Sequence, residues 1–399
     1  MSKKILVLEP YLDLLGGSER MAFEVAKGLA KEGWEIHVGY EREGVWKERY
    51  QAFAKGFHPI RLPVLTFRHP WELIGTVWRL RGLMRRLGIR VILTSHNGHL
   101  LTAALLERFG GVRSCFHLGL MGAVANTVSG RWAVRQISAG VAPSEQTAES
   151  WREIGWPKET MHVVPNWIDW EKYSKLPAKK EARTELGIWD MGYGISDEKR
   201  KAESGRSPRT QGLGAGKAGE NGKNLKVVGY VGRLVQEKGI EVLLEAWKGV
   251  EEKIPEAVLL IAGSGTPEYE KELKKRAGAR VRFLGPVADP RPVYVVSDLV
   301  VVPSLWEEPF GLIPLEAVAC GTLPLVSDRG FLPGLVAGVG EDLIHPAGDT
   351  VALGRQIVSW LGCSRTEVIA QVRKALAQKF SGERGLAEYR ALLEAAVGA

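Results

Sequence analysis

The first 170 residues alternate short apolar runs with longer segments of helical periodicity. The run "KKILVLE" predicts a buried parallel strand, because apolar residues fill every position between its charged ends. After a loop, "RMAFEVAKGLAKEG" has the apolar spacing of a helix that ends at Gly33. Further strands are predicted at "WEIHVGYE", "RVILTSH", "VRSCFHLG" and "AGVAPSE". Strands that alternate with helices indicate βαβ units and a parallel sheet covered on both faces.

The second half of the chain repeats this pattern. Strands are predicted at "LKVVGYVGRL", "AVLLIAGSG", "RVRFLGPV", "LVVVPS" and "TLPLVSD", and helices at "IEVLLEAWKGVEEK", "YEKELKKRAG" and "IPLEAVACG". We therefore expect an α/β chain with two Rossmann-like, doubly wound domains that face a cleft. The expected first domain is 1–170, the second is 171–380, and 381–399 is a C-terminal helix that packs back toward the first domain.

Residues 189–224 differ from both halves. They contain eight glycines in 36 residues and few bulky apolar residues. Such a segment cannot bury enough surface to offset the entropy of ordering it, so we predict a flexible insertion. A tolerated surface loop and a regulatory or binding segment both remain open.

Composition narrows the class of protein. The chain has 399 residues, of which 45% are hydrophobic, and no apolar run of about 18 or more residues. We read no signal peptide and expect a cytoplasmic location. Three cysteines, Cys115, Cys320 and Cys363, are sparse enough to indicate a reducing compartment, and their spacing fits no zinc site. The net charge of +8 suits anionic partners. A nucleic-acid binder would need cations interleaved with aromatic residues on one face, whereas the charged motifs of this chain are predicted to point into a cleft, so we expect no nucleic-acid partner.

Two carboxylates lie around a predicted helix start in "WEEPFGLIPLEAVACG". Glu308 precedes the helix, and Glu316 lies one to two turns into it. The first turn of a helix offers unsatisfied N–H groups to an anion, and Gly311 lets a ligand approach the backbone closely. Because carboxylates accept hydrogen bonds from hydroxyls, this stretch predicts a cradle for a phosphate or a sugar.

A second candidate is the strand-to-helix loop in "GYVGRLVQEKG", which holds Arg233 and Lys238. Two cations at the carboxyl edge of a parallel sheet would meet a ligand where open α/β sheets bind them. Arginine grips phosphate through a planar fork, and lysine acts as a compact charge. A weaker candidate is Gly16-Gly17 after the first strand, where backbone N–H groups can face an anion, although Gly-Gly turns are common.

Three histidines compete for a role at the edge of the first sheet. His117 lies at a strand end, and His96 and His99 follow the preceding strand in "TSHNGH". A strand-end histidine can hydrogen-bond a sugar hydroxyl, but a lone histidine is more often a satisfied core residue. Position alone does not decide between them.

Together these motifs resemble those of the retaining glycosyltransferases of family 4, which have the GT-B fold. "WEEPFGLIPLEAVACG" is similar to that family's paired-glutamate motif, and "GYVGRLVQEKG" to its Gly-Arg and Lys-Gly signature. The stretch that ends in "PNWID" resembles the segment leading from the first domain into the second. The resemblance extends along most of the chain except 189–224.

The resemblance implies a catalytic set that consists of His117, Arg233, Lys238 and Glu308. It implies a donor-binding set that consists of Gly16, Gly17, Gly263, Gly265, Val287, Phe310, Gly311, Leu312 and Glu316. In such enzymes the two cations bind the diphosphate of a nucleotide sugar, and the loop around Val287 holds the base. Glu316 would accept hydrogen bonds from the ribose, and His117 would lie beside an outer hydroxyl of the sugar.

The implied reaction is transfer of a hexosyl group with formation of an α-linkage. UDP-glucose is the favoured donor, ahead of GDP-mannose and UDP-N-acetylglucosamine, and the acceptor is a small molecule, a saccharide or a lipid-linked molecule. The chain contains no Asp-x-Asp, the metal-carrying motif of other glycosyltransferases, so we expect no metal and no further cofactor. The cations would instead stabilise the leaving diphosphate.

The sequence departs from the family pattern at two places. Trp167 stands where the family usually has glycine, which would put a bulky ring near the hinge or the acceptor mouth. "SDRGFLPGLV" lacks the glutamate that in the family commonly follows the second glycine-rich turn, so whether this stretch contacts the donor remains open.

Other functions and a second surface also remain open. A nucleotide-sugar epimerase of the same fold would need acid and base carboxylates in the first domain, where no clear set occurs; a non-catalytic nucleotide-sugar-binding protein is the other alternative. In 69–90, one helical stripe of Leu73, Val77, Leu80, Met84 and Leu87 runs beside several arginines. It fits a core-packing helix with a basic flank, or a membrane-surface helix in peripheral contact with the inner membrane.

Overall fold

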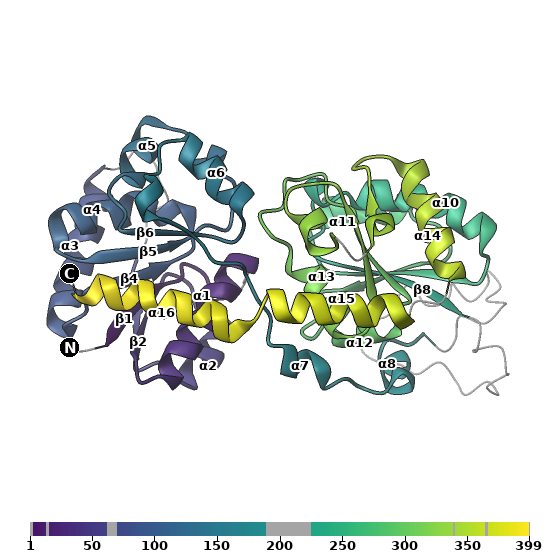
Figure 1. The fold of residues 1–399 in the computed structure, drawn as a ribbon, viewed down its shortest axis with the longest axis horizontal. Helices are drawn as coiled ribbons and strands as arrows, with labels where there is room; N and C mark the ends of the chain where they lie inside the picture. The colour runs from purple at the N-terminus through teal and green to yellow at the C-terminus, as the bar shows by residue number, and fades with distance from the viewer. Residues whose placement is uncertain are drawn as a thin grey trace. The chain divides into compact units, whose positions relative to one another are not determined.

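The computed structural model describes residues 3–12, 16–61, 70–188, 225–337, 340–363 and 366–398. These residues form two compact units, each built on one parallel sheet (Figure 1). The first unit consists of Met1–Asp169, Glu307–Leu312 and Leu376–Ala399, and the second of Trp170–Trp306 and Ile313–Ala375. The expectation of an α/β chain with two doubly wound sheets is confirmed, whereas the insertion predicted at 189–224 lies outside the described residues.

The sheet of the first unit has the strand order β3-β2-β1-β4-β5-β6-β7, and all neighbouring strands are parallel. Its strands are β1 (Lys4–Leu8), β2 (Glu35–Tyr40), β3 (Gly56–Pro59), β4 (Val91–Thr94), β5 (Arg113–His117), β6 (Ala139–Ala142) and β7 (Met161–Val163). The apolar pattern predicted five of them. It missed β3 and β7, because "GFHP" and "MHV" are short segments with few apolar residues.

Helices cover both faces of this sheet. They are α1 (Gly17–Lys31), α2 (Trp46–Gln51), α3 (Pro70–Leu87), α4 (Leu100–Gly110), α5 (Val128–Val134), α6 (Glu145–Glu153) and α16 (Gly382–Gly398). The C-terminal helix α16 packs against α1, β4 and β5 (Figure 1). On the opposite face, Leu80 and Met84 of α3 pack with Leu6, Leu8 and Ile92 of the strands.

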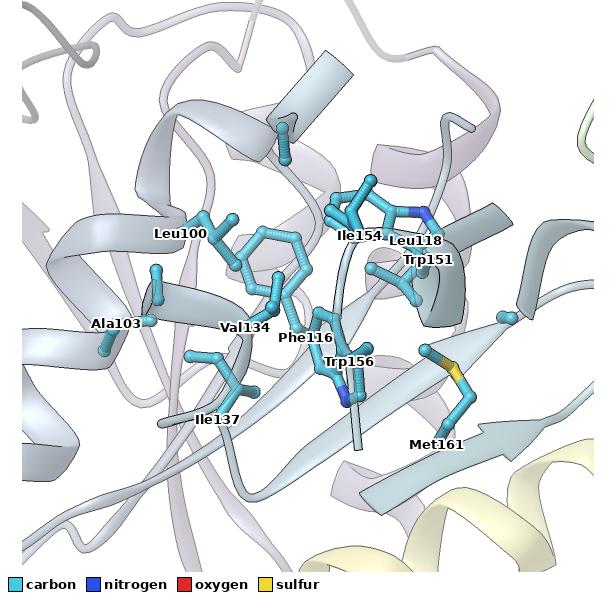
Figure 2. Close-up of a cluster of buried hydrophobic side chains, with 14 of the residues drawn as sticks. Leu100, Ala103, Phe116, Leu118, Val134, Ile137, Trp151, Ile154, Trp156 and Met161 are labelled. Atoms are coloured by element: carbon cyan, nitrogen blue, oxygen red, sulfur yellow. The ribbon is translucent and has the colours of Figure 1, made fainter. Parts of the chain in front are cut away.

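A second apolar cluster lies under α4, α5 and α6, as Figure 2 shows. Phe116 of β5 and Trp151 of α6 are both fully buried in it. The Trp151 ring meets the Trp156 ring edge to face at 5.6 Å, and its Nε1 donates a hydrogen bond to the Leu120 carbonyl at 2.8 Å. Trp151 therefore satisfies its polar atom while it fills the core.

The sheet of the second unit has the order β10-β9-β8-β11-β12-β13, again with parallel neighbours. Its strands are β8 (Lys226–Val231), β9 (Ala257–Ala262), β10 (Val281–Gly285), β11 (Leu299–Val302), β12 (Leu323–Ser327) and β13 (Ile344–His345). The remaining helices are α7 (Trp170–Ser174), α8 (Lys179–Glu185), α10 (Ile240–Lys253), α11 (Pro267–Arg276), α12 (Arg291–Val296), α13 (Leu312–Ala319), α14 (Thr350–Gly362) and α15 (Thr366–Lys379). No helix among the described residues has the length and apolar composition needed to cross a bilayer.

We predict that Trp151→Ala lowers the free energy of unfolding by about 3–5 kcal/mol, because it removes a buried ring from a closely packed core. Chemical denaturation followed by circular dichroism measures this change. Trp78→Ala is the matched control: its side chain is 65% exposed, so the loss should stay within about 0.5 kcal/mol. Equal losses in the two variants would contradict the core assignment.

Candidate functional site

Each sheet has one position where the strand order reverses. In the second unit it lies between β8 and β11, and in the first unit between β1 and β4. Ligands of open α/β sheets bind at the carboxyl ends of the strands at such a position. The loops after the two neighbouring strands run to opposite sides of the sheet there, and a crevice is left between them. Arg233 and Lys238 follow β8 directly, and the segment with Glu308 follows β11.

The loops after β8 and β9 touch through their backbones. A Cβ at Gly263 would lie 1.8 Å from the Gly232 carbonyl oxygen, and one at Gly265 would lie 2.2 Å from the Leu234 carbonyl oxygen. The Leu234 N–H donates to the Ser264 carbonyl at 2.8 Å. No side chain fits at these two glycines, so they have a packing role, and donor contact by them stays a prediction.

The cationic loop itself is short and tightly held. The Arg233 side chain is exposed, and Lys238 ends a 3₁₀ turn over Gln236–Lys238. Gly239 follows with a φ of 68°, and a Cβ there would lie 1.9 Å from the Pro303 carbonyl oxygen. The loop is therefore pressed against the segment that follows β11.

Hydrogen bonds join the same two segments. The Glu237 carbonyl accepts from the N–H groups of Leu305 at 2.9 Å and Trp306 at 3.1 Å. These bonds fix Leu305 and Trp306, at the start of the paired-glutamate motif, to the loop that carries both cations. Within the second unit, the structure thus joins the cationic loop to the residues at the start of the paired-glutamate motif, about 70 positions later in the sequence.

Glu316 lies on α13 and is fully buried. Its Oε2 accepts a hydrogen bond of 2.7 Å from the Tyr294 hydroxyl on α12. Sequence reasoning placed Glu316 on a short helix, which is confirmed, but it missed Tyr294, which carries no motif. Gly311, directly before α13, has a φ of 98° that only glycine adopts readily.

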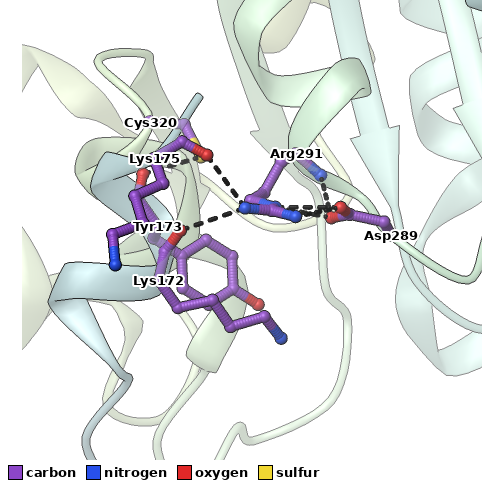
Figure 3. Close-up of polar contacts among 6 residues, drawn as sticks. All are labelled: Lys172, Tyr173, Lys175, Asp289, Arg291 and Cys320. Carbon is purple, nitrogen blue, oxygen red and sulfur yellow. Dashed lines mark hydrogen bonds and ion pairs between the residues drawn. The ribbon is translucent and has the colours of Figure 1, made fainter. Parts of the chain in front are cut away.

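The loop after β10 carries Val287, which is partly exposed. Two residues further on, Asp289 accepts hydrogen bonds from the Arg291 guanidinium, the shortest at 2.6 Å (Figure 3). Arg291 Nη1 also donates to the backbone carbonyls of Lys172 at 3.1 Å and Lys175 at 2.9 Å. The guanidinium therefore ties the loop after β10 to the region of α7 within the second unit.

In the first unit, Gly16 is the N-terminal cap of α1 and Gly17 is its first residue, and both are exposed. Their amide groups lie at the positive end of a 15-residue helix, a position suited to an anion. The segment with Pro309 is held to the same unit by Ser144 and Thr147, whose hydroxyls donate to the Pro309 carbonyl at 2.8 and 3.2 Å. Phe310 is buried against Phe380, with ring centroids 5.2 Å apart.

His117 ends β5 and is only 1% exposed. Its Nδ1 lies 2.6 Å from the hydroxyl of Tyr389 on α16, while its buried Nε2 has no hydrogen-bond partner in the described part of the chain. Burial lowers the pKa of His117 to about 4 and raises the pKa of the Tyr389 phenol, so both are neutral at pH 7. A phenol that donates to Nδ1 leaves the ring proton on Nε2.

The other two histidines differ from His117. His99 is buried, bonds Thr94 Oγ1 through Nδ1 at 3.0 Å, and has a pKa lowered to about 3 by burial. His99 is thus a core residue. His96 is half-buried, and its Nδ1 accepts the Gly98 N–H at 3.2 Å, so it caps a local turn.

Trp167 lies near the end of the first unit's segment Met1–Asp169 and packs inward. Its side chain is 7% exposed and meets the Tyr389 ring at 6.0 Å. Gly382 and Gly385 on α16 make room for it, since a Cβ at Gly385 would lie 2.4 Å from the indole. The tryptophan that replaces the family's glycine therefore fits because the facing helix α16 has glycine at two positions.

Glu9 is a buried acid that sequence reasoning missed. It follows β1, is fully buried, and neither carboxyl oxygen has a hydrogen-bond partner among the described residues. Burial, with a smaller contribution from Glu19, raises the pKa of Glu9 well above its usual value. Its position directly after an apolar strand, at the strand-order reversal, was the signal that could have found it.

The predicted site residues are divided between the two units. The first unit holds His117, Gly16, Gly17, Glu308, Phe310, Gly311 and Leu312, and the second holds Arg233, Lys238, Gly263, Gly265, Val287 and Glu316. Among the described residues, no three His, Cys, Asp or Glu side chains gather in a way that could hold a metal ion.

Two parallel sheets, each with candidate residues at its strand-order reversal, define a two-domain, doubly wound α/β protein. Residues 15–172 match the model of glycosyltransferase family 4, and residues 217–375 match the model of the group 1 glycosyl transferases. The two matches do not overlap and together extend over most of the chain. The chain belongs to the family 4, group 1 glycosyltransferases.

Curated relatives match part of the chain. An uncharacterized glycosyltransferase of Methanocaldococcus jannaschii is 36% identical over 165 residues, 39% of this chain and 41% of the relative. A D-inositol 3-phosphate glycosyltransferase of Rhodococcus erythropolis is 36% identical over 37% of this chain and 35% of its own length. A phosphatidyl-myo-inositol mannosyltransferase of Mycobacterium leprae is 34% identical over 34% of this chain and 37% of its own. Each match thus spans well under half of the relative's length.

Solved structures match over nearly the full length and identify the GT-B fold. Anabaena Alr3699/HepE in complex with UDP and glucose covers 98% of this chain and 99% of its own, with a TM-score of 0.77 and 20% identity. Sucrose-phosphate synthase from Thermosynechococcus elongatus covers 98% of this chain and 100% of its own, with a TM-score of 0.72 and 19% identity.

We predict that the Tyr389 phenol donates to His117 Nδ1, so that the neutral ring carries its proton on Nε2. Long-range ¹H–¹⁵N correlation spectra of the ring report the tautomer directly. Tyr389→Phe should populate both tautomers and lower the free energy of unfolding by about 1–3 kcal/mol, since it orphans a buried nitrogen. A wild-type ring protonated on Nδ1, or a variant with an unchanged tautomer, would rule this arrangement out.

Glu9 predicts a pH dependence of stability. Its pKa is raised in the folded state, so above about pH 4.5 the unfolded state ionises while the folded state keeps its proton. The free energy of unfolding should therefore fall as the pH rises above this value. Urea titrations of the wild type and Glu9→Gln at several pH values test this: the variant should show a shallower fall, and parallel curves would refute it.

Proposed function

We propose that this chain transfers a hexosyl group from a nucleotide-diphosphate sugar to an acceptor, with retention of configuration. The observation that carries the proposal is the joining of the cationic loop and the paired-glutamate segment by hydrogen bonds to the Glu237 carbonyl. This joining occurs at the strand-order reversal of the second sheet, where ligands of such sheets bind.

The chemistry follows from the charges that develop during transfer. As the bond between sugar and phosphate loosens, negative charge builds up on the leaving diphosphate. Arg233 and Lys238, fixed in their loop by Gly239, would stabilise that charge without reorganisation. The amide groups of Gly16 and Gly17 at the start of α1 would contact the distal phosphate.

Carboxylates and backbone groups would hold the rest of the donor. In this proposal Glu316 binds the ribose hydroxyls, while Tyr294 holds its other oxygen in place. Glu308 lies by the donor sugar, with the backbone amides of Phe310, Gly311 and Leu312. His117 lies beside an outer sugar hydroxyl, with its ring oriented by Tyr389. The loop around Val287 contacts the base.

The comparisons support a nucleotide-sugar donor and suggest acceptor classes. UDP and UDP-glucose occupy the Anabaena protein of the same fold, which supports UDP-glucose as the favoured donor here. The names of the two inositol-linked relatives support an acceptor such as an inositol phosphate or a phospholipid. We further propose that the two cations take the place of a metal ion and that no other cofactor is required.

We predict that Arg233→Ala and Lys238→Ala each lower kcat/KM for the donor by roughly a hundred- to a thousandfold, because each removes a preorganised charge from the leaving group. Release of nucleoside diphosphate from UDP-glucose, GDP-mannose and UDP-N-acetylglucosamine measures this. Addition of a metal chelator should leave the rate unchanged, and the sugar–acceptor product should be an α-anomer by NMR.

Lys271→Ala is the matched control, because it removes an exposed lysine from α11 of the same unit. Its kcat/KM should stay within about twofold of the wild-type value. Binding of UDP-glucose without release of diphosphate with any acceptor would show that the chain is a non-catalytic binding protein. Conversion of the free nucleotide sugar to an isomer would show that it is an epimerase. Either result overturns the proposal.

A further inference from the structure

Helix α3 carries two apolar stripes, and they have different surroundings. Leu80 and Met84 are buried in the core, which confirms the core-packing interpretation of that stripe. A second stripe consists of Trp71, Ile74 and Trp78, which are 80%, 44% and 65% exposed. These three residues follow an i, i+3, i+7 spacing, so they share one face of the helix.

The exposed stripe is unusual for a surface that faces only water. Large apolar side chains occur singly on protein surfaces, but two indoles and an isoleucine on one helical face indicate a partner of low polarity. Tryptophan suits the boundary between lipid and water in particular, since its ring is apolar and its N–H group is polar.

The charge of the same helix identifies the partner. Arg79, Arg81, Arg85 and Arg86 accompany a single acid, Glu72, which itself lies 3.8 Å from Arg61. The Arg81 guanidinium lies 5.6 Å from the Trp78 ring, so cation and indole share one surface. Arginines beside exposed indoles complement an anionic phospholipid surface.

Helix α4, which lies next to α3 in the first unit, and helix α5, which lies next to α4, add to the positive charge of this surface. Helix α4 packs between α3 and α5. It adds Arg108, whereas its Glu107 is turned inward, where it accepts the N–H groups of Ser114 and Ser138. Helix α5 adds Arg131 and begins with Val128, which is 90% exposed.

The topology places the stripe near the functional edge of the first sheet. Because α3 connects the carboxyl end of β3 to the start of β4, the Trp71 end of the helix lies at the edge where His117 ends β5. We propose that α3 lies along the surface of an anionic bilayer, with Trp71, Ile74 and Trp78 at the lipid–water boundary and the arginines on the headgroups. This binding goes beyond sugar transfer and does not depend on it.

Sedimentation of the purified full-length protein with large vesicles tests the proposal. We expect binding to phosphatidylcholine vesicles that contain about 30% phosphatidylglycerol, much weaker binding to phosphatidylcholine alone, and release as salt rises from about 0.05 M to about 0.5 M. Trp71→Ala/Trp78→Ala and Arg85→Gln/Arg86→Gln should each lower the partition coefficient by about tenfold or more.

Lys271→Gln/Lys275→Gln is the matched control, because it removes two exposed positive charges from α11 in the second unit. It should bind vesicles within about twofold of the wild type. Wild-type protein that stays in the supernatant with anionic vesicles at low salt would overturn the proposal. So would a dimer in sedimentation velocity that the tryptophan variant converts to monomer, since the stripe would then be an interface between copies.

An assay of diphosphate release from a soluble donor tests sugar transfer independently of membrane binding. The tryptophan and arginine variants should keep the wild-type rate with a water-soluble acceptor. A fall in that rate together with retained vesicle binding would place the stripe in the transfer site and contradict a membrane role.

Discussion

The contact between the loop after β8 and the segment after β11 holds the proposed diphosphate site in place. Gly239 has no room for a side chain because the Pro303 carbonyl oxygen occupies that space, and the Glu237 carbonyl binds the N–H groups of Leu305 and Trp306. These contacts hold the loop with the two cations against Pro303, Leu305 and Trp306 within the second unit. A site that neutralises a leaving diphosphate needs its charges in place before the reaction, because reorganising them would add to the barrier.

The sequence predicted most of the sheets and most of the charged motifs. A short apolar run bounded by turn residues, such as that of β9, indicates a buried strand, and the loops that follow parallel strands lie at one sheet edge. The short strands β3, β7 and β13 were missed because their pairing comes from neighbouring strands and not from their own residues. The exposed stripe of α3 was also missed, since periodicity shows which residues share a face but not which face is covered.

Partners that lie far apart in the chain could not be predicted. Tyr389 meets His117 across 272 positions, and Tyr294 meets Glu316 from another helix. The Trp167 ring shows the same limit: its position suggested a bulky ring near the hinge or the acceptor mouth, but not that two glycines on α16 make room for it. The C-terminal helix α16 thus contacts two residues that lie far from it in the sequence. Its Tyr389 hydroxyl orients the His117 ring, and its two glycines leave space for the Trp167 ring.

The most direct measurement of the central claim is calorimetric titration of wild type and Arg233→Ala with UDP and with uridine. If the cationic loop binds the diphosphate, the variant should lose affinity for UDP by about 1.5–3 kcal/mol and keep its affinity for uridine. An equal loss for both ligands, or no loss for UDP, would show that Arg233 does not contact the diphosphate and would contradict the account.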